Sequence, residues 1–375
     1  MTRRLSVLHL IDRNRLESGS TVQMLSAALG LAGRGHDVWV ASRRGGDLEA
    51  ACRETGVSSV PLPLWGPFDL VSAAKLRRFL RRQHVEIVHV HKGAPHAVAL
   101  IASTGLGRQP RVVVNRGVSF PLDFINRWKY RHPRVAAVVC VADAVRDVVV
   151  ASSGVRPELV HTIHGGTDVA VFDPLKVDGD IVRRALGIDP QQVLFGQVSV
   201  RDWKGWSVLI RAFAHVNPGA PDVRLLFVGC DHDRDRIRVA TEANRAGVAD
   251  KVFTLPYRRD MPAVLAACDV VVDASYAGTG ITGTIREAMA LARPVIASDC
   301  GGNRELVVDG EVGLLVRPRD PNALAGALSR LIDDPDLRNR LGLAARKRVV
   351  EHFSTDRRID QLETLYRKIV KDIEL

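Results

Sequence analysis

One stretch of the chain combines the residue types that bind anions and sugar hydroxyls. Residues 273–304 read DASYAGTGITGTIREAMALARPVIASDCGGNR, in which a Gly/Thr-rich loop at 278–283 precedes a helix-forming run that carries one acid, Glu287. Backbone N–H groups at the start of such a helix, together with the helix dipole, attract phosphate. A carboxylate one turn further on can accept hydrogen bonds from two adjacent sugar hydroxyls. The stretch therefore predicts a site for a phosphorylated sugar compound; the alternative is a simple tight turn.

Hydroxyl groups and cations accompany this loop. Thr279, Thr282 and Thr284 offer hydroxyl donors to the same anion. Upstream, the segment GQVSVRDWKG contains Arg201 and Lys204 directly after a predicted strand. Two such cations would neutralise a bound diphosphate and the charge that develops on a departing nucleotide. The alternative is that both are solvated loop residues.

The elements that must position these residues alternate along the chain. Apolar, β-branched runs predict strands that include 6–11, 38–41, 85–91, 111–117, 135–142, 193–199, 223–229 and 293–298, together with the short runs SVPLPL, KVFTLP, DVVVDAS and GLLVRP. Runs with helical periodicity predict helices that include 22–33, 72–84, 95–103, 207–216, 261–267, 284–292, 322–332 and 355–373. Alternation of this kind is typical of parallel sheets covered on both faces. We therefore predict an α/β fold of two doubly wound, Rossmann-like domains, linked at 164–174 and facing a central cleft at the carboxyl ends of their strands.

Composition limits the class of protein. The 375 residues, 46% hydrophobic and 25% charged, suffice for two or three globular domains. No apolar run reaches the roughly 18–20 residues of a membrane helix, and polar residues follow the short N-terminal run at once, unlike a signal peptide. Five cysteines without a CxxC spacing predict reduced, buried thiols and no zinc site. We therefore expect a cytoplasmic protein.

The net charge of +11 is concentrated in the first half of the chain. Residues 1–170 hold 23 Lys/Arg against 13 Asp/Glu, whereas residues 171–375 hold 30 against 29. This asymmetry predicts a polyanionic partner for the first half, a membrane surface or glycolipid rather than nucleic acid; the alternative is a charge that only aids solubility. Basic residues at 75–82 and at 127–134, the latter with Trp128 and Tyr130, could contact the inner face of a membrane peripherally; the alternative is a merely solvated helix face.

The succession of motifs resembles the family 4 retaining glycosyltransferases of GT-B fold, also called group 1 glycosyltransferases. The match spans almost the whole length, and its most specific part is the order of LPYRRDMPAVLAACDVVVDAS, REAMALARPVIASDCGGNREL and DGEVGLLVRPRD. The resemblance implies an acceptor-side domain at 1–168, a nucleotide-sugar-binding domain at 169–354 and a C-terminal helix at 355–375 that packs on the first domain. It implies transfer of a sugar from a nucleoside-diphosphate sugar to a hydroxyl acceptor, with retention, without a metal or another cofactor. A lipid- or polysaccharide-linked glycan of the cell envelope is the expected acceptor.

Site residues can be carried over from the resemblance by position. Lys204 would contact the diphosphate, and Glu287 would bind the ribose hydroxyls. Backbone amides would hold a phosphate at the start of the helix, and Gly19 would line the cleft from the first domain. The implied donor-binding set is therefore Gly19, Thr279, Gly280, Ile281, Thr282, Gly283, Glu287 and Lys204, and the catalytic set is Lys204, Arg201 and Glu287.

Two departures concern the donor half. The family usually has two glutamates eight positions apart, and the first of them falls at Thr279, which keeps a hydrogen-bonding group but lacks the charge. The usual Gly-Arg pair is here Gly196–Gln197, so Arg201 is expected to replace the missing cation.

The acceptor side departs as well. After the strand at 111–117 the family often has a histidine, where this chain offers Asn115 and Arg116; with His91 they form the acceptor-side candidates. Two other functions stay open. One is a sugar-nucleotide epimerase of the same architecture, and the other is a non-catalytic nucleotide-sugar-binding subunit, which the loss of the acid at Thr279 suggests.

Overall fold

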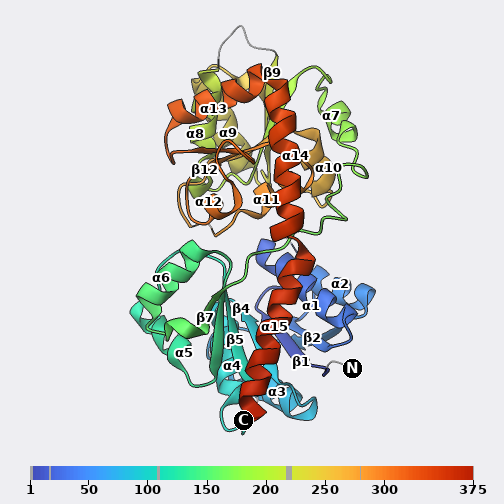
Figure 1. Cartoon of the computed structure of the whole chain (residues 1–375), viewed down its shortest axis with the longest axis vertical. Helices are drawn as coiled ribbons and strands as arrows, with labels where there is room; N and C mark the ends of the chain where they lie inside the picture. The colour runs from blue at the N-terminus through green and yellow to red at the C-terminus, as the bar shows by residue number, and fades with distance from the viewer. Residues whose placement is uncertain (1–2, 17, 108–109, 217–221, 279, 375) are drawn as a thin grey trace. The chain divides into compact units, whose positions relative to one another are not determined.

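The chain folds into two compact α/β units (Figure 1). The structure, a computed structural model, describes residues 3–16, 18–107, 110–216, 222–278 and 280–374. Unit 1 comprises Met1–Gly166 and Thr355–Leu375, and unit 2 comprises Thr167–Ser354. Within the described residues, no helix has both the length and the apolar character needed to cross a bilayer.

The described residues of unit 1 form seven parallel strands in the order β3-β2-β1-β4-β5-β6-β7. The strands are β1 (Ser6–Ile11), β2 (Asp37–Arg43), β3 (Ser58–Leu62), β4 (Ile87–His91), β5 (Arg111–Arg116), β6 (Val135–Cys140) and β7 (Val160–Thr162). The helices are α1 (Gly19–Gly33), α2 (Asp47–Thr55), α3 (Leu70–Arg82), α4 (Gly93–Ser103), α5 (Arg127–Arg131), α6 (Asp143–Ser153) and α15 (Thr355–Glu374), with 3-10 turns η1 (Phe124–Asn126) and η2 (Pro157–Leu159). Every residue of β4 is buried, as expected for a central strand of a covered parallel sheet.

In unit 2 the part of the chain that the structure describes forms six parallel strands, in the order β10-β9-β8-β11-β12-β13. They are β8 (Val193–Val198), β9 (Val223–Val228), β10 (Val252–Leu255), β11 (Val270–Asp273), β12 (Val295–Ser298) and β13 (Leu314–Val316). The helices are α7 (Asp180–Leu186), α8 (Trp206–Ala214), α9 (Asp233–Arg245), α10 (Met261–Ala267), α11 (Gly283–Ala290), α12 (Asn303–Leu306), α13 (Pro321–Asp333) and α14 (Pro335–His352), with 3-10 turns η3 (Asp202–Lys204) and η4 (Ala249–Lys251).

The strand order reverses between β8 and β11, which lie side by side. In open α/β sheets the carboxyl ends of two such strands diverge into loops on opposite faces, and ligands bind between those loops. The segment with Lys204 follows β8, and the Gly/Thr-rich loop follows β11. The topology of unit 2 therefore places both predicted anion-binding segments at one position.

The predicted architecture of doubly wound parallel sheets is confirmed. The strand at 6–11 and the helix at 261–267 begin and end where the sequence predicts. The predicted elements include neither α9 nor α14. In α9 only Val239 and Ala243 are buried, so the helix shows too few apolar positions for a clear period.

Helix α15 returns to unit 1 and packs along α1 (Figure 1). Its apolar side chains, among them Leu362 and Tyr366, are fully buried in the core between the sheet and α1. Gly30 of α1 makes this close contact without a side chain, because a Cβ there would lie 1.9 Å from Cδ1 of Ile359. The C-terminal helix is therefore part of the core of unit 1.

Candidate functional site

A buried carboxylate lies at the strand-order switch of unit 2. Asp273 is the last residue of β11, is 3% exposed, and forms an ion pair with Lys204, whose Nζ lies 3.3 Å from Oδ1. The lysine belongs to η3, after β8. The ion pair thus joins the two loops that diverge at the switch.

Three further donors saturate this carboxylate. Oγ of Ser275 donates to Oδ1 at 2.7 Å, Oγ1 of Thr282 donates to Oδ2 at 2.8 Å, and Nδ2 of Asn303 donates to Oδ2 at 3.0 Å. Burial alone would raise the pKa of Asp273, but the Lys204 charge and the three hydrogen bonds outweigh it and hold the pKa below its ordinary value. Asp273 is therefore a charged hub for the lysine, the Gly/Thr-rich loop and α12.

The loop that carries Lys204 is fixed against the end of β11. Gly205 has φ +64°, and a Cβ there would lie 2.0 Å from the carbonyl oxygen of Ala274, so only glycine fits this approach. The amide of Tyr276 donates to the Trp203 carbonyl at 2.9 Å. Gln197 spans the two loops, because its Nε2 donates to the Lys204 carbonyl at 3.1 Å and its Oε1 accepts from the Ala274 amide at 3.2 Å.

Among the described residues, no side-chain cap hydrogen bond closes the start of helix α11. Thr282 occupies the N-cap position in extended conformation, yet its side chain makes no cap hydrogen bond. Its hydroxyl is oriented toward Asp273, to which it donates. N–H groups in the first turn of a helix have no acceptor within the helix, so an uncapped start favours an external anion. The preceding loop is closed by the Gly302 amide, which donates to the Gly280 carbonyl at 3.1 Å.

Glu287 lies one turn into α11, close to that helix start. A Cβ built on Gly283 would lie 3.8 Å from Oε1 of Glu287, so the carboxylate points toward the first residue of the helix. Burial raises the pKa of Glu287, and the charge of Arg286 opposes the shift. Arg286 is 3% exposed, and its Nε donates to Oγ1 of Thr167 at 2.7 Å, which ties α11 to the first residue of unit 2.

The remaining donor-side candidates lie less centrally. Arg201 is exposed, and its guanidinium lies 5.5 Å from the centre of the Trp203 ring, whereas Lys204 turns inward to Asp273. Ile281 is half-buried in the loop before α11. The prediction for Thr279 falls on a position outside the described residues.

The predicted site residues of unit 1 lie at or near the carboxyl ends of β1, β4 and β5. Gly19 is exposed as the first residue of α1, after β1. Asn115 and Arg116 end β5 and are half-buried. His91 ends β4 but is only 2% exposed, because its ring packs against His9 and His89 on the same face of the sheet.

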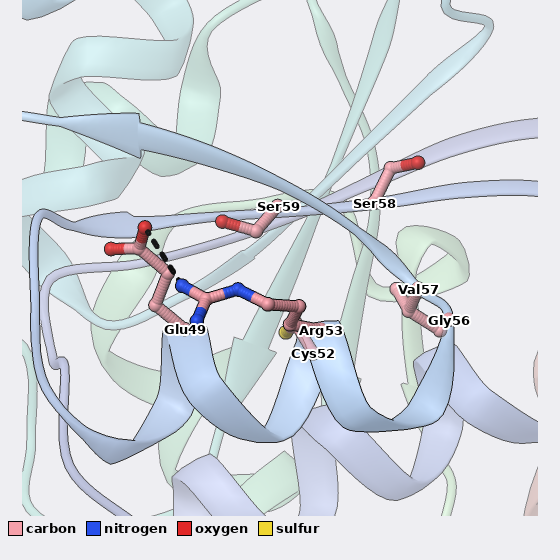
Figure 2. Close-up of a pocket in the computed structure, with 7 residues that line it drawn as sticks. All are labelled: Glu49, Cys52, Arg53, Gly56, Val57, Ser58 and Ser59. Atoms are coloured by element: carbon pink, nitrogen blue, oxygen red, sulfur yellow. Dashed lines mark ion pairs between the residues drawn. The ribbon is translucent and has the colours of Figure 1, made fainter.

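Unit 1 also has an open pocket of about 320 Å³ between α2 and the start of β3 (Figure 2). The Arg53 side chain reaches toward Glu49 across its rim, with Nη2 4.0 Å from Oε1. Ser58 and Ser59 line the opposite wall. None of the predicted site residues lines this pocket, so we assign it no part in the site.

Reasoning from the sequence did not identify Asp273, Asn303 or Gln197 as site residues. An acidic residue after an apolar, β-branched run is expected to be the exposed polar end of a strand. Its immediate neighbours do not indicate that its side chain is buried. The signal that could have found Asp273 is the run VVVD directly before a loop rich in hydroxyl residues, which could satisfy a buried carboxylate.

Two family models match successive parts of the chain. The family model described as Glycosyltransferase Family 4 matches residues 18–171, and the one described as Glycosyl transferases group 1 matches residues 189–334. The α-D-kanosaminyltransferase of Streptomyces kanamyceticus is 27% identical over 363 residues, which cover 87% of this chain and 91% of that protein.

Two further similarities extend over most of the chain. The UDP-Gal:α-D-GlcNAc-diphosphoundecaprenol α-1,3-galactosyltransferase of Escherichia coli is 25% identical over 310 residues, covering 80% of this chain and 79% of that protein. The crystal structure of Anabaena Alr3699/HepE in complex with UDP-glucose superposes with a TM-score of 0.80 at 22% identity, covering 98% of this chain and 99% of that one. The chain therefore belongs to the family 4 glycosyltransferases, and its two parallel-sheet units have the GT-B fold of that family.

Proposed function

We propose that the protein transfers a sugar from a nucleoside-diphosphate sugar to a hydroxyl acceptor with retention of configuration. The proposal rests on one observation: Asp273 connects Lys204 to the start of α11, because it forms an ion pair with the lysine and accepts a hydrogen bond from Thr282. A cation and an uncapped helix N-terminus held at one strand-order switch match the two needs of a diphosphate, charge neutralisation and hydrogen-bond donors. The names of the E. coli relative and of the Anabaena complex mention UDP-Gal and UDP-glucose, which supports a nucleotide-sugar donor.

The residues of unit 2 then take the following roles. Lys204 and the N–H groups at 280–283 bind the diphosphate, and the Glu287 carboxylate accepts from the two ribose hydroxyls. Arg201, one turn before Lys204, adds positive charge beside the departing phosphate. These groups provide the charge stabilisation that a metal ion supplies elsewhere, so the proposed reaction needs no metal.

The chemical step exchanges one bond at the anomeric carbon for another on the same face. The bond from that carbon to the diphosphate oxygen breaks, and a bond to the acceptor oxygen forms. The acceptor proton passes to the departing diphosphate, whose negative charge Lys204 stabilises. No enzymatic nucleophile takes part in this scheme, and the leaving group itself acts as the base.

The proposed acceptor is a glycan or glycolipid of the cell envelope, with the protein in the cytoplasm. The excess of basic residues in the first half of the chain supports an anionic acceptor, and Asn115 and Arg116 at the end of β5 are the candidates to contact it. The name of the E. coli relative, which describes a lipid diphosphate acceptor, is consistent with this class.

The test incubates the protein with nucleotide sugars, with and without a mixture of lipid-linked and soluble glycan acceptors. Transfer that requires an acceptor, keeps the anomeric configuration and persists in EDTA supports the proposal. A changed nucleotide sugar released from the donor alone would identify an epimerase instead. If donor binds but no product forms, a binding subunit is indicated, and activity gained on Thr279→Glu would attribute the loss to that position.

A further inference from the structure

Unit 1 exposes a group of large apolar side chains in the segment between β5 and β6. The exposed fractions are 53% for Phe120, 84% for Phe124, 79% for Ile125 and 43% for Trp128. We call these four side chains the 120–128 surface. Phe124 and Trp128 are four positions apart in the helical turn formed by η1 and α5, so they lie on one face. Large apolar side chains that are exposed together in one segment mark a candidate interaction site.

The backbone beneath this surface is anchored to its neighbours. Nζ of Lys129 donates to the Gly93 carbonyl at 3.2 Å, and the Leu122 amide donates to Oγ of Ser152 at 3.1 Å. Tyr130 is 7% exposed and packs edge-on against the His96 ring. The inner face of α5 is thus buried against α4 and α6 (Figure 1), which holds the apolar side chains outward.

The charge around the surface is positive. Residues 111–134 contain six Lys/Arg and one acid, Asp123, whose carboxylate is engaged by the backbone and side chain of Asn126. The Arg127 guanidinium lies 5.8 Å from the centre of the Phe124 ring, and Arg131 is exposed at the end of α5. Nε of Arg131 also donates to the Ser153 carbonyl at 3.3 Å, and Lys129 and Arg134 likewise donate to backbone carbonyls, but Arg131 is exposed whereas Lys129 is buried.

We infer that the 120–128 surface docks on an anionic lipid bilayer. Phe124, Ile125 and Trp128 would enter the boundary between headgroups and acyl chains, and Arg127 and Arg131 would contact lipid phosphates. A short helical face with large apolar side chains flanked by arginines has the composition of an interfacial anchor. The charge of the first half of the chain favours this occupant over a second copy, because two such surfaces would repel each other.

The inference goes beyond the proposed transfer reaction, which can be measured with a soluble acceptor away from any membrane. It also places a lipid surface near the acceptor-side candidates, because Arg116 donates to the Phe120 carbonyl within the same segment. Docking and transfer can be measured separately, so failure of one leaves the other intact.

The experiment measures binding of the full-length protein to vesicles of phosphatidylcholine alone and of phosphatidylcholine mixed with phosphatidylglycerol. We expect sedimentation with the anionic vesicles at low salt. The double variant Phe124→Ser/Ile125→Ser should bind them about tenfold more weakly, since both changes remove apolar area from the contact. The matched control is Leu175→Ser/Leu343→Ser, which removes two side chains that are 93% and 68% exposed in unit 2. This control should bind like the wild type.

Several outcomes would overturn the inference. One is a wild-type protein that does not sediment with anionic vesicles at low salt, and another is an unchanged affinity of the Phe124→Ser/Ile125→Ser variant. A wild-type dimer that this variant converts to a monomer would show that a second copy covers the surface instead. The rate of transfer to a soluble acceptor should be equal in the variant and the wild type. Equal rates would show that the variant is folded and that its loss of docking is separate from catalysis.

Discussion

The Lys204 ammonium and the Asp273 carboxylate form a largely buried ion pair across the strand-order switch of unit 2, with 3.3 Å between Nζ and Oδ1. The lysine side chain is 17% exposed and that of the aspartate 4%. A cation held in this way is oriented before a ligand arrives. A bound diphosphate would then share the lysine with Asp273, so the strength of this pair should affect both the stability of unit 2 and its affinity for nucleotides.

Replacing Asp273 should therefore destabilise the protein. Asp273→Asn leaves Lys204 without its counter-charge in a site with little solvent, and we expect a loss of about 2–4 kcal/mol in the free energy of unfolding. Urea denaturation at neutral pH measures this loss. Asp299→Asn is the matched control, because it removes a carboxylate whose ion pair with Arg304 is exposed, and it should change the unfolding free energy little. Equal effects of the two variants would refute the role of Asp273 as a buried hub.

Glu287 should contribute to binding at some cost to stability. Burial raises its pKa above the ordinary value of 4.5, so the folded state holds its proton more tightly than the unfolded state. The contribution of Glu287 to the free energy of unfolding therefore decreases as the pH rises from about 4.5 through the raised pKa. Glu287→Gln should be at least as stable as the wild type at neutral pH, yet bind nucleoside diphosphate about tenfold more weakly, because a charged acceptor for the ribose hydroxyls is lost.

Calorimetric titration and thermal unfolding of the Glu287→Gln variant check both parts. In the wild type, nucleotide affinity should also decrease as the pH falls and Glu287 takes up its proton, whereas the variant should lack this component. A variant that is less stable than the wild type but binds nucleotide normally would assign Glu287 a structural role.

Gly205 should tolerate no side chain. Its φ is +64°, and a Cβ at this position would lie 2.0 Å from the carbonyl oxygen of Ala274, so the loop must shift in Gly205→Ala. We expect a loss of roughly 3 kcal/mol or more in unfolding free energy. Gly187→Ala is the matched control, because Gly187 has φ +66° but nothing within 4 Å of where a Cβ would lie, and only about 1 kcal/mol should be lost there. Similar losses in both variants would mean that backbone conformation alone, and not the contact with the end of β11, requires Gly205.

The sequence predicts the sheets of both units but only part of the site. Periodic apolar runs are enough for β1 and α10, whose bounds match, because local burial patterns determine them. The glycines of the loop at 278–283 and the acidic residue Glu287 are enough to predict an anion-binding loop. The inward turn of Asp273 and the bridging by Gln197 depend on contacts between residues 69 to 77 positions apart, which no local pattern encodes. Thr282 illustrates the limit, since its hydroxyl was predicted to bind the ligand and instead donates to Asp273.

The stability of unit 1 should depend on pH through three buried histidines. Nδ1 of His9 lies 3.0 Å from Nε2 of His91, and Nδ1 of His89 lies 2.5 Å from the Tyr366 hydroxyl. Burial, together with the charge of Arg358, lowers the pKa of His9 to about 3 and lowers those of the other two well below the ordinary value. The unfolded state therefore binds more protons below about pH 6.5, and stability decreases as the pH falls through this range.

Each neutral histidine can contribute up to about 1.4 kcal/mol per pH unit to this decrease. Urea unfolding between about pH 7.5 and 5 measures the slope. His89→Gln removes one titrating group and should give a shallower slope, although the protein itself becomes less stable. His232→Gln, a change at an exposed position, should keep the wild-type slope. An unchanged slope in His89→Gln would show that these histidines do not control the acid sensitivity.

The central claim, that Lys204 and the start of α11 bind the diphosphate of a nucleotide, can be tested by one comparison of affinities. A thermal-shift screen of UDP, GDP, ADP and CMP first identifies the preferred base, because a ligand that binds only the folded state raises its apparent stability. Calorimetry then measures the affinities of the nucleoside and of its diphosphate for the wild type and for Lys204→Met. The diphosphate should bind the wild type far more tightly than the nucleoside does, and Lys204→Met should lose most of this difference while its affinity for the nucleoside stays the same. An equal ratio of the two affinities in both proteins would show that Lys204 does not bind the diphosphate.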